Sequence, residues 1–225
     1  MASALILIVS SVLVVFLWLQ VQYQADNKRS FFQAVAFAVF WLVALLVAGR
    51  SGLFSNFDKF PSPFMFFFPC LILVSVFLGF SKFGTVVIQN VTLGNLVFFH
   101  SFRILAEVVL YLALTEGRAP VQMTFEGFNF DIITGVVAFF LGLYLRKKSA
   151  PRLALVFNIM GLVFLAVIAF IAMTSMPTPL RVFMNEPSNI WVTTWPYILL
   201  PGVLVLAAIT GHFMIFRKLK SLAVL

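Results

Sequence analysis

The stretch VTLGNLVFFHSFRILAEVVLYLALT, residues 91–115, decides what kind of fold this chain can adopt. It holds 25 residues, most of them apolar, and a helix needs about 20 such residues to cross the hydrocarbon core of a bilayer. Three ionisable side chains, His100, Arg103 and Glu107, nevertheless interrupt it. The stretch therefore predicts a transmembrane helix that carries ionisable groups.

The composition of the whole chain indicates a membrane protein. Hydrophobic residues make up 63% of the sequence and charged residues 10%, whereas soluble domains average about 45–50% and about 25%. The net charge of +8 does not indicate nucleic acid, because Lys and Arg flank apolar runs, as in RKKSAPR (146–152) and RKLK (217–220). We therefore expect the lipid bilayer as a partner and no nucleic acid.

Apolar runs predict an all-α fold, a polytopic membrane helix bundle of seven transmembrane helices in a single domain, 1–225. The fifth run is the shortest. The predicted spans are residues 2–21, 31–49, 63–80, 91–115, 132–145, 153–174 and 197–216.

The distribution of basic residues predicts the orientation of the bundle. With the N-terminus outside and the C-terminus inside, the inner loops hold ten Lys and Arg residues and the outer loops hold four. This agrees with the positive-inside rule. The three longest loops, 50–64, 116–131 and 175–196, then lie outside, where irregular chain is expected to bind ligands or partners.

A polar stripe runs along the fourth predicted span. At 100° per residue, His100, Arg103, Glu107 and Tyr111 fall within about 80° of the helix circumference. Arg103 and Glu107, one turn apart, could form a buried ion pair that only joins helices. Alternatively, the stripe lines a polar cavity, where Arg103 binds an anionic group, Glu107 or His100 carries a proton, and Tyr111 forms a hydrogen-bonding wall.

The loop before the fifth predicted span, MTFEGFNFDIITG (123–135), combines Glu126, Asn129 and Asp131 with three phenylalanines. We expect Asp131 to cap the fifth helix, where its charge also suits the positive end of the helix dipole. The phenylalanines favour a segment that dips back into the membrane interface. Such chain is tolerated there only where protein or water covers it, so we expect the loop to act as a lid over the polar cavity.

The run FRILAEVVLYLALTEGRAPVQMTFEGFNFDI (102–132) resembles a block found in uncharacterised bacterial multi-span membrane proteins. The residues that carry the resemblance are Arg103, Glu107, Gly117, Pro120 and MTFEGFNFDI. The resemblance implies a bacterial inner membrane as the location, and it implies no activity.

Cofactor chemistry finds little support in the sequence. His100 and His212, the latter placed near the inner end of the last predicted span, could act as two ligands for haem or a metal ion. No carboxylate or thiol accompanies them, so we expect no metal and no cofactor. The P-loop, GxSxG, HExxH and CxxC motifs are missing, which argues against an enzyme with soluble-type chemistry.

Three functions remain open at this point. The first is a membrane protein that binds or moves a small solute or ion, with a small anionic solute or protons as its partner. The second is a non-catalytic accessory or scaffold subunit that assembles with other membrane subunits. The third is an intramembrane enzyme that acts on lipid or isoprenoid substrates.

Overall fold

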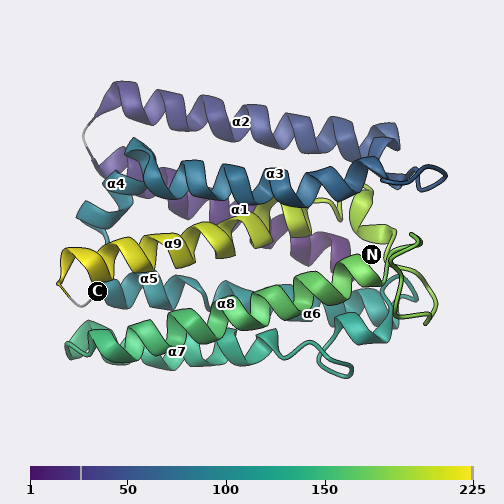
Figure 1. The fold of residues 1–225 in the computed structure, drawn as a ribbon. Helices are drawn as coiled ribbons and strands as arrows, with labels where there is room; N and C mark the ends of the chain where they lie inside the picture. The colour runs from purple at the N-terminus through teal and green to yellow at the C-terminus, as the bar shows by residue number, and fades with distance from the viewer. Residues whose placement is uncertain (26, 224–225) are drawn as a thin grey trace.

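The computed structural model describes residues 1–25 and 27–223, and each regular element within those residues is helical. The helices lie roughly side by side, and α1 begins at the opposite end of the bundle from the end of α9 (Figure 1). The helices are α1 (Ala2–Gln24), α2 (Lys28–Ser51), α3 (Pro63–Phe80), α4 (Lys82–Asn90), α5 (Leu93–Phe99), α6 (Phe102–Thr115), α7 (Asp131–Lys147), α8 (Pro151–Thr174) and α9 (Leu206–Ser221). Shorter turns are η1 (Leu53–Ser55), η2 (Val121–Met123), η3 (Trp191–Thr193) and η4 (Leu200–Val205), the last of them π-helical.

Six helical segments of the described chain are long and apolar enough to cross a membrane. The prediction of an all-helical membrane bundle is therefore confirmed at this level. The six segments are Ala2–Gln24, Lys28–Ser51, Pro63–Phe80, Leu93–Thr115, Pro151–Thr174 and Leu200–Ser221. The fifth predicted span, 132–145, corresponds to α7, whose 17 residues extend only about 25 Å, less than the roughly 30 Å of a hydrocarbon core.

The fourth predicted span is not one regular helix. It divides at His100 and Ser101 into α5 and α6. Around this break the backbone bonds reach back three residues, as from His100 N–H to Val97 O and from Arg103 N–H to His100 O, both 3.1 Å. Such tight turns change the angle between successive side chains, so the uniform 100° spacing does not hold between His100 and the rest of the stripe.

Helix α7 packs closely along α5 and the beginning of α6. A Cβ atom at Gly142 would lie 2.6 Å from the Phe98 Cα, and one at Gly135 would lie 2.8 Å from the Ile104 backbone nitrogen. These two glycines let the helix backbones approach, and the reversed order of their contacts shows that α7 runs antiparallel to α5 and α6. As a result, α7 begins beside Arg103. Arg103 lies 12 residues before the end of α6 at Thr115, which is roughly 18 Å along a helix.

The loop between α6 and α7 covers the part of α6 that α7 does not reach. Gln122, Met123, Thr124 and Asn129 are buried in this loop, whereas its three phenylalanines point outward and are exposed. The buried polar groups of the loop bond different partners, Asn129 with Glu107 of α6 and Gln122 with Ser175 after α8.

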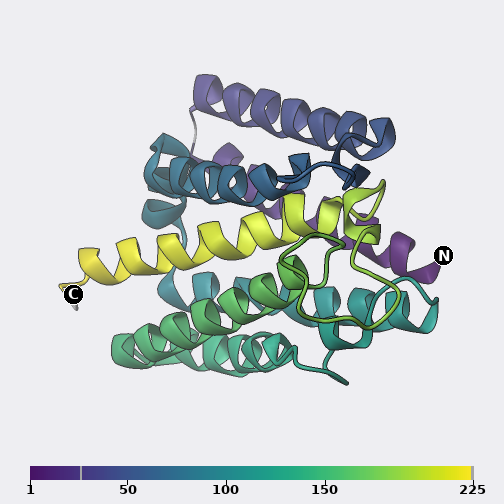
Figure 2. The same cartoon turned by 45° about the vertical axis from the view of Figure 1, so that its right-hand side comes forward.

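Helix α9 runs through the middle of the bundle, between the pair α2 and α3 on one side and α7 and α8 on the other (Figure 2). It packs against α3, α8, α5 and α4. Its segment, Leu200–Ser221, is the most buried of the six membrane-length segments. A polar residue in the middle of α9 therefore lies at the centre of the protein.

Candidate functional site at the centre of the bundle

Arg103 and Asp131 form a buried ion pair between α6 and α7. The Arg103 Nε donates to Asp131 Oδ2 at 2.7 Å, and Nη2 lies 2.5 Å from Oδ1. Only 2% of the Arg103 side chain is exposed. The first contact is a hydrogen bond to a charged acceptor, and the second is an ionic contact, because Oδ1 makes no hydrogen bond with the described residues.

This pairing differs from the Arg103–Glu107 ion pair that the helical spacing favoured. Within a helix, Arg four residues before Glu is the less favourable order for an ion pair. Asp131, the first residue of α7, is the partner of Arg103 instead. The N-cap of α7 is Phe130, so Asp131 does not cap the helix as expected. It lies in the first turn, where its charge suits the helix dipole, and it binds Arg103.

The remaining polar atoms of the guanidinium contact α8 and α9. Nη1 lies 3.0 Å from His212 Nε2, and both Nη atoms lie 3.4 Å from the Gly161 carbonyl oxygen. Because arginine only donates, His212 Nε2 must accept, and His212 Nδ1 then carries the proton that is donated to Asn158 Oδ1 at 2.8 Å. Asn158 therefore fixes the tautomer of His212.

Gly161 makes room for this contact. A Cβ atom there would lie 2.6 Å from His212 Cε1, so a side chain at this position would displace the imidazole ring. Nothing in the sequence singles out Gly161, because its role depends on a ring from another helix.

Only one of the two carboxylate oxygens of Glu107 makes a hydrogen bond with the described residues. Its Oε1 accepts a hydrogen bond from Asn129 Nδ2 at 2.6 Å, while Oε2 has no hydrogen-bond partner among the described residues. Asn129 Nδ2 also donates to Met123 O at 3.0 Å, and Asn129 Oδ1 accepts from the Asp131 N–H at 3.0 Å. Asn129 thus ties the loop both to α6 and to the beginning of α7.

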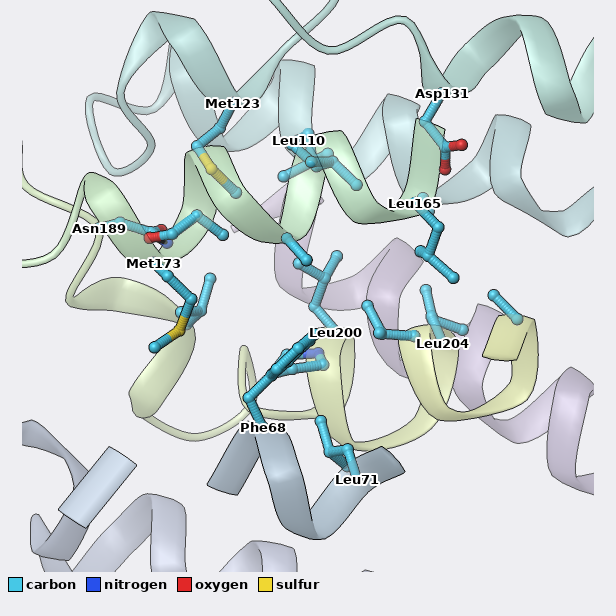
Figure 3. Close-up of a pocket in the computed structure, with 18 of the residues that line it drawn as sticks. Phe68, Leu71, Leu110, Met123, Asp131, Leu165, Met173, Asn189, Leu200 and Leu204 are labelled. Atoms are coloured by element: carbon cyan, nitrogen blue, oxygen red, sulfur yellow. Dashed lines mark hydrogen bonds between the residues drawn. The ribbon is translucent and has the colours of Figure 1, made fainter. Parts of the chain in front are cut away.

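These charged groups border a cavity of about 100 Å³, which has room for about three water molecules. Arg103, Glu107 and Asp131 belong to its lining, and apolar side chains of α3, α8 and η4 make up most of the rest. In Figure 3, Asp131, Leu110 and Met123 lie along one wall, with Phe68 and Leu71 of α3 on the opposite wall.

His100 lies at the break between α5 and α6 and is fully buried. Its ring lies 4.2 Å from that of His212, centroid to centroid, and packs against Gly211 of α9. His212 is in the middle of the segment Leu200–Ser221, not near its inner end as the sequence suggested. Within the described residues, no group of three or more His, Cys, Asp or Glu side chains could hold a metal ion.

Two predicted site residues lie away from the cluster. Tyr111 is exposed and stacks on Phe125 of the loop, with ring centroids 5.2 Å apart. Glu126 is exposed in the same loop. The structure therefore brings together His100, Arg103, Glu107, Asn129 and Asp131, and it adds His212, Asn158 and Gly161 to them.

An all-helical bundle with membrane-length helices and a buried ionic cluster at its centre defines a polytopic membrane protein. The chain belongs to the family described as domain of unknown function DUF8737, whose model matches residues 59–220, well over half of the chain. The matched part contains the whole cluster, and α1 and α2 lie outside it. Comparison with curated proteins finds no match, and comparison with solved structures finds none either.

Proposed function

We propose that this protein binds or moves a small solute or ion through the cavity beside α6, and that Glu107 is the group that contacts the ligand. The observation that carries this proposal is the position of the Glu107 Oε2 atom. It is buried, it lacks a partner among the described residues, and Glu107 borders the cavity. Buried polar atoms are almost always paired, so an unpaired one beside a cavity favours a ligand as its partner.

The charges of the lining favour a proton or a small cation as that ligand. Arg103 and Asp131 neutralise each other, so Glu107 is the unpaired one of the three charged groups in the lining. The donors of Arg103 already contact Asp131, Gly161 and His212, and an anionic solute would have to displace Asp131 to reach them. A cavity of about 100 Å³ also suits an ion with a few waters better than a larger solute.

The proposal includes seven crossings of a bacterial inner membrane, with the N-terminus outside. Helix α7 and the loop before it would together make the crossing between α6 and α8. The start of α1 and the end of α9 at opposite ends of the bundle support an odd number of crossings (Figure 1). The concentration of Lys and Arg at the end where α9 finishes supports a cytoplasmic location for that end.

Proteoliposomes test the proposed function directly. An imposed pH gradient, or a gradient of Na⁺ or K⁺, should decay faster with the wild-type protein than in protein-free liposomes. Glu107→Gln, which keeps an oxygen for Asn129 but removes the charge, should return the decay to the protein-free rate. Glu126→Gln, an exposed change in the covering loop, is the matched control and should retain the flux. Equal flux through wild type and Glu107→Gln would refute the proposal.

A second function, an accessory subunit of a membrane complex, is favoured by one observation. Arg103 is fully engaged and buried, as expected of a group that joins α6, α7, α8 and α9. Under this proposal the wild-type protein gives no flux of any of the three ions, and Glu107→Gln changes neither folding nor assembly.

A further inference from the structure

A second cavity, of about 470 Å³, lies among α1, α2, α4, α5 and α9 and is separate from the candidate site. Its lining on α9 and η4 extends from Gly202 to Met214, roughly 18 Å along the helix axis. Nearly all of the lining side chains are apolar, and the rings of Trp18 and Trp41 belong to them. The cavity is therefore long and apolar, with the dimensions of a hydrocarbon chain rather than of a compact solute.

Polar side chains gather at one end of this cavity. Gln24 ends α1, Asn90 ends α4, Asn95 lies in the first turn of α5, and Arg146 lies in the last turn of α7. All four are exposed members of the lining. An apolar cavity with a polar mouth matches an amphipathic ligand.

The guanidinium of Arg146 is held in place at this mouth. Its Nε donates to Asn95 Oδ1 at 2.7 Å, and its Cζ lies 4.2 Å from the centroid of the Phe98 ring. The two Nη atoms make no hydrogen bond with the described residues. An arginine oriented in this way can give a phosphate two parallel hydrogen bonds at little further cost in side-chain entropy.

The surrounding charges also suit an anionic head group. We call this end of the bundle the basic end, after the basic residues at the helix ends and turns there: Lys28, Arg29, Lys82, Arg146, Lys147, Lys148, Arg152, Arg217, Lys218 and Lys220. The acidic residues of the described chain lie in the loops of the opposite end or in the candidate site: Asp58, Glu107, Glu116, Glu126, Asp131 and Glu186. Basic groups near a membrane surface attract anionic lipids.

We propose that this cavity is a binding site for an anionic phospholipid. One acyl chain lies along α9 beside Trp18 and Trp41, and the phosphate accepts hydrogen bonds from the Nη atoms of Arg146, with Asn90 and Asn95 beside it. The site is independent of the function proposed for the Glu107 cavity, because the two linings share no residue.

Quenching of tryptophan fluorescence by brominated lipids tests this site. The protein is reconstituted in phosphatidylcholine vesicles that contain increasing mole fractions of dibrominated phosphatidylglycerol or of dibrominated phosphatidylcholine. We expect half-maximal quenching at a roughly fivefold lower mole fraction of the brominated phosphatidylglycerol, the preference that one well-placed basic residue provides. Removing the reporter rings with Trp18→Phe and Trp41→Phe should abolish the selective part of the quenching.

Two variants separate the site from general attraction. Arg146→Gln should remove the preference for phosphatidylglycerol, whereas Lys148→Gln, a nearby basic residue outside the lining, should keep it. Ala207→Phe, which fills the cavity, should reduce quenching by both lipids. If Arg146→Gln does not fold, Asn95→Ala, which releases the guanidinium, replaces it and should weaken the preference. Equal quenching by both lipids in the wild type, or an equal loss in Arg146→Gln and Lys148→Gln, would overturn the proposal.

Discussion

Breaking the ion pair between Arg103 and Asp131 should destabilise the protein far more than breaking an exposed ion pair. Removing one member of a buried pair leaves an uncompensated charge and costs about 3–5 kcal/mol. We expect Arg103→Met to fall near the upper value, because it leaves the carboxyl of Asp131 beside that of Glu107 and takes the donor from His212. Asp131→Asn should fall near the lower value, because the guanidinium keeps its contacts with Gly161 and His212.

The double variant Arg103→Met/Asp131→Asn separates the pair from its surroundings. Since the double variant leaves no unpaired charge from this pair, it should be more stable than Arg103→Met alone. The coupling free energy between the two substitutions should be on the order of 3 kcal/mol. The assay is reversible unfolding of the purified protein in mixed detergent micelles. The control is Glu186→Gln, which breaks the exposed pair with Arg181 and should cost at most about 1 kcal/mol. Strictly additive single variants, or singles within about 0.5 kcal/mol of wild type, would refute the reasoning.

Three further outcomes follow from other parts of the structure. Gly142→Ala should lower the free energy of unfolding by about 1–3 kcal/mol, because the added Cβ would overlap the backbone of α5. Thermal denaturation in detergent measures this change, and an unchanged midpoint would contradict the close packing. Asn129→Ala should release the loop from Glu107, so hydrogen exchange in the loop between α6 and α7 should rise while exchange in α9 stays unchanged. The hydrogen bond from the Met1 amino group lowers the pKa of Glu116 from 4.5 to about 2, so its stabilising contribution is complete above pH 4.5 and is lost as the pH falls through about 2. Glu116→Gln should flatten the dependence of the melting temperature on pH in that interval, and a profile identical to wild type would contradict this account.

The two cavities lie toward different ends of the bundle and differ in their linings. The smaller one lies beneath the loop between α6 and α7 and contains the charged groups of the candidate site. The larger one opens at the basic end and is almost wholly apolar. Helix α9 contributes to both through η4 and its first turns, so a change in its position would alter both linings together.

The helical class of the fold and most of the helix positions follow from the sequence, because a bilayer requires long apolar segments whose backbone groups are paired within each helix. Ionisable residues are rare in such segments, so His100, Arg103 and Glu107 are conspicuous in the sequence alone. The loop with Asn129 and Asp131 is conspicuous for the same reason, since its polar residues stand between apolar runs. These are properties of single segments, and the sequence displays them directly.

Which groups contact one another was decided by the tertiary structure alone. Helical spacing offered Glu107 as the partner of Arg103, but the close packing at Gly135 and Gly142 brings Asp131 to Arg103 instead. Tyr111 lies on the predicted stripe, in the same helix as Arg103 and Glu107, and yet is exposed and stacks on Phe125 of the loop. Local periodicity determines which residues share one helix face. Contacts between helices depend on how far each helix is offset along the bundle. Small residues that are far apart in the chain determine these offsets, because they allow close packing at particular positions.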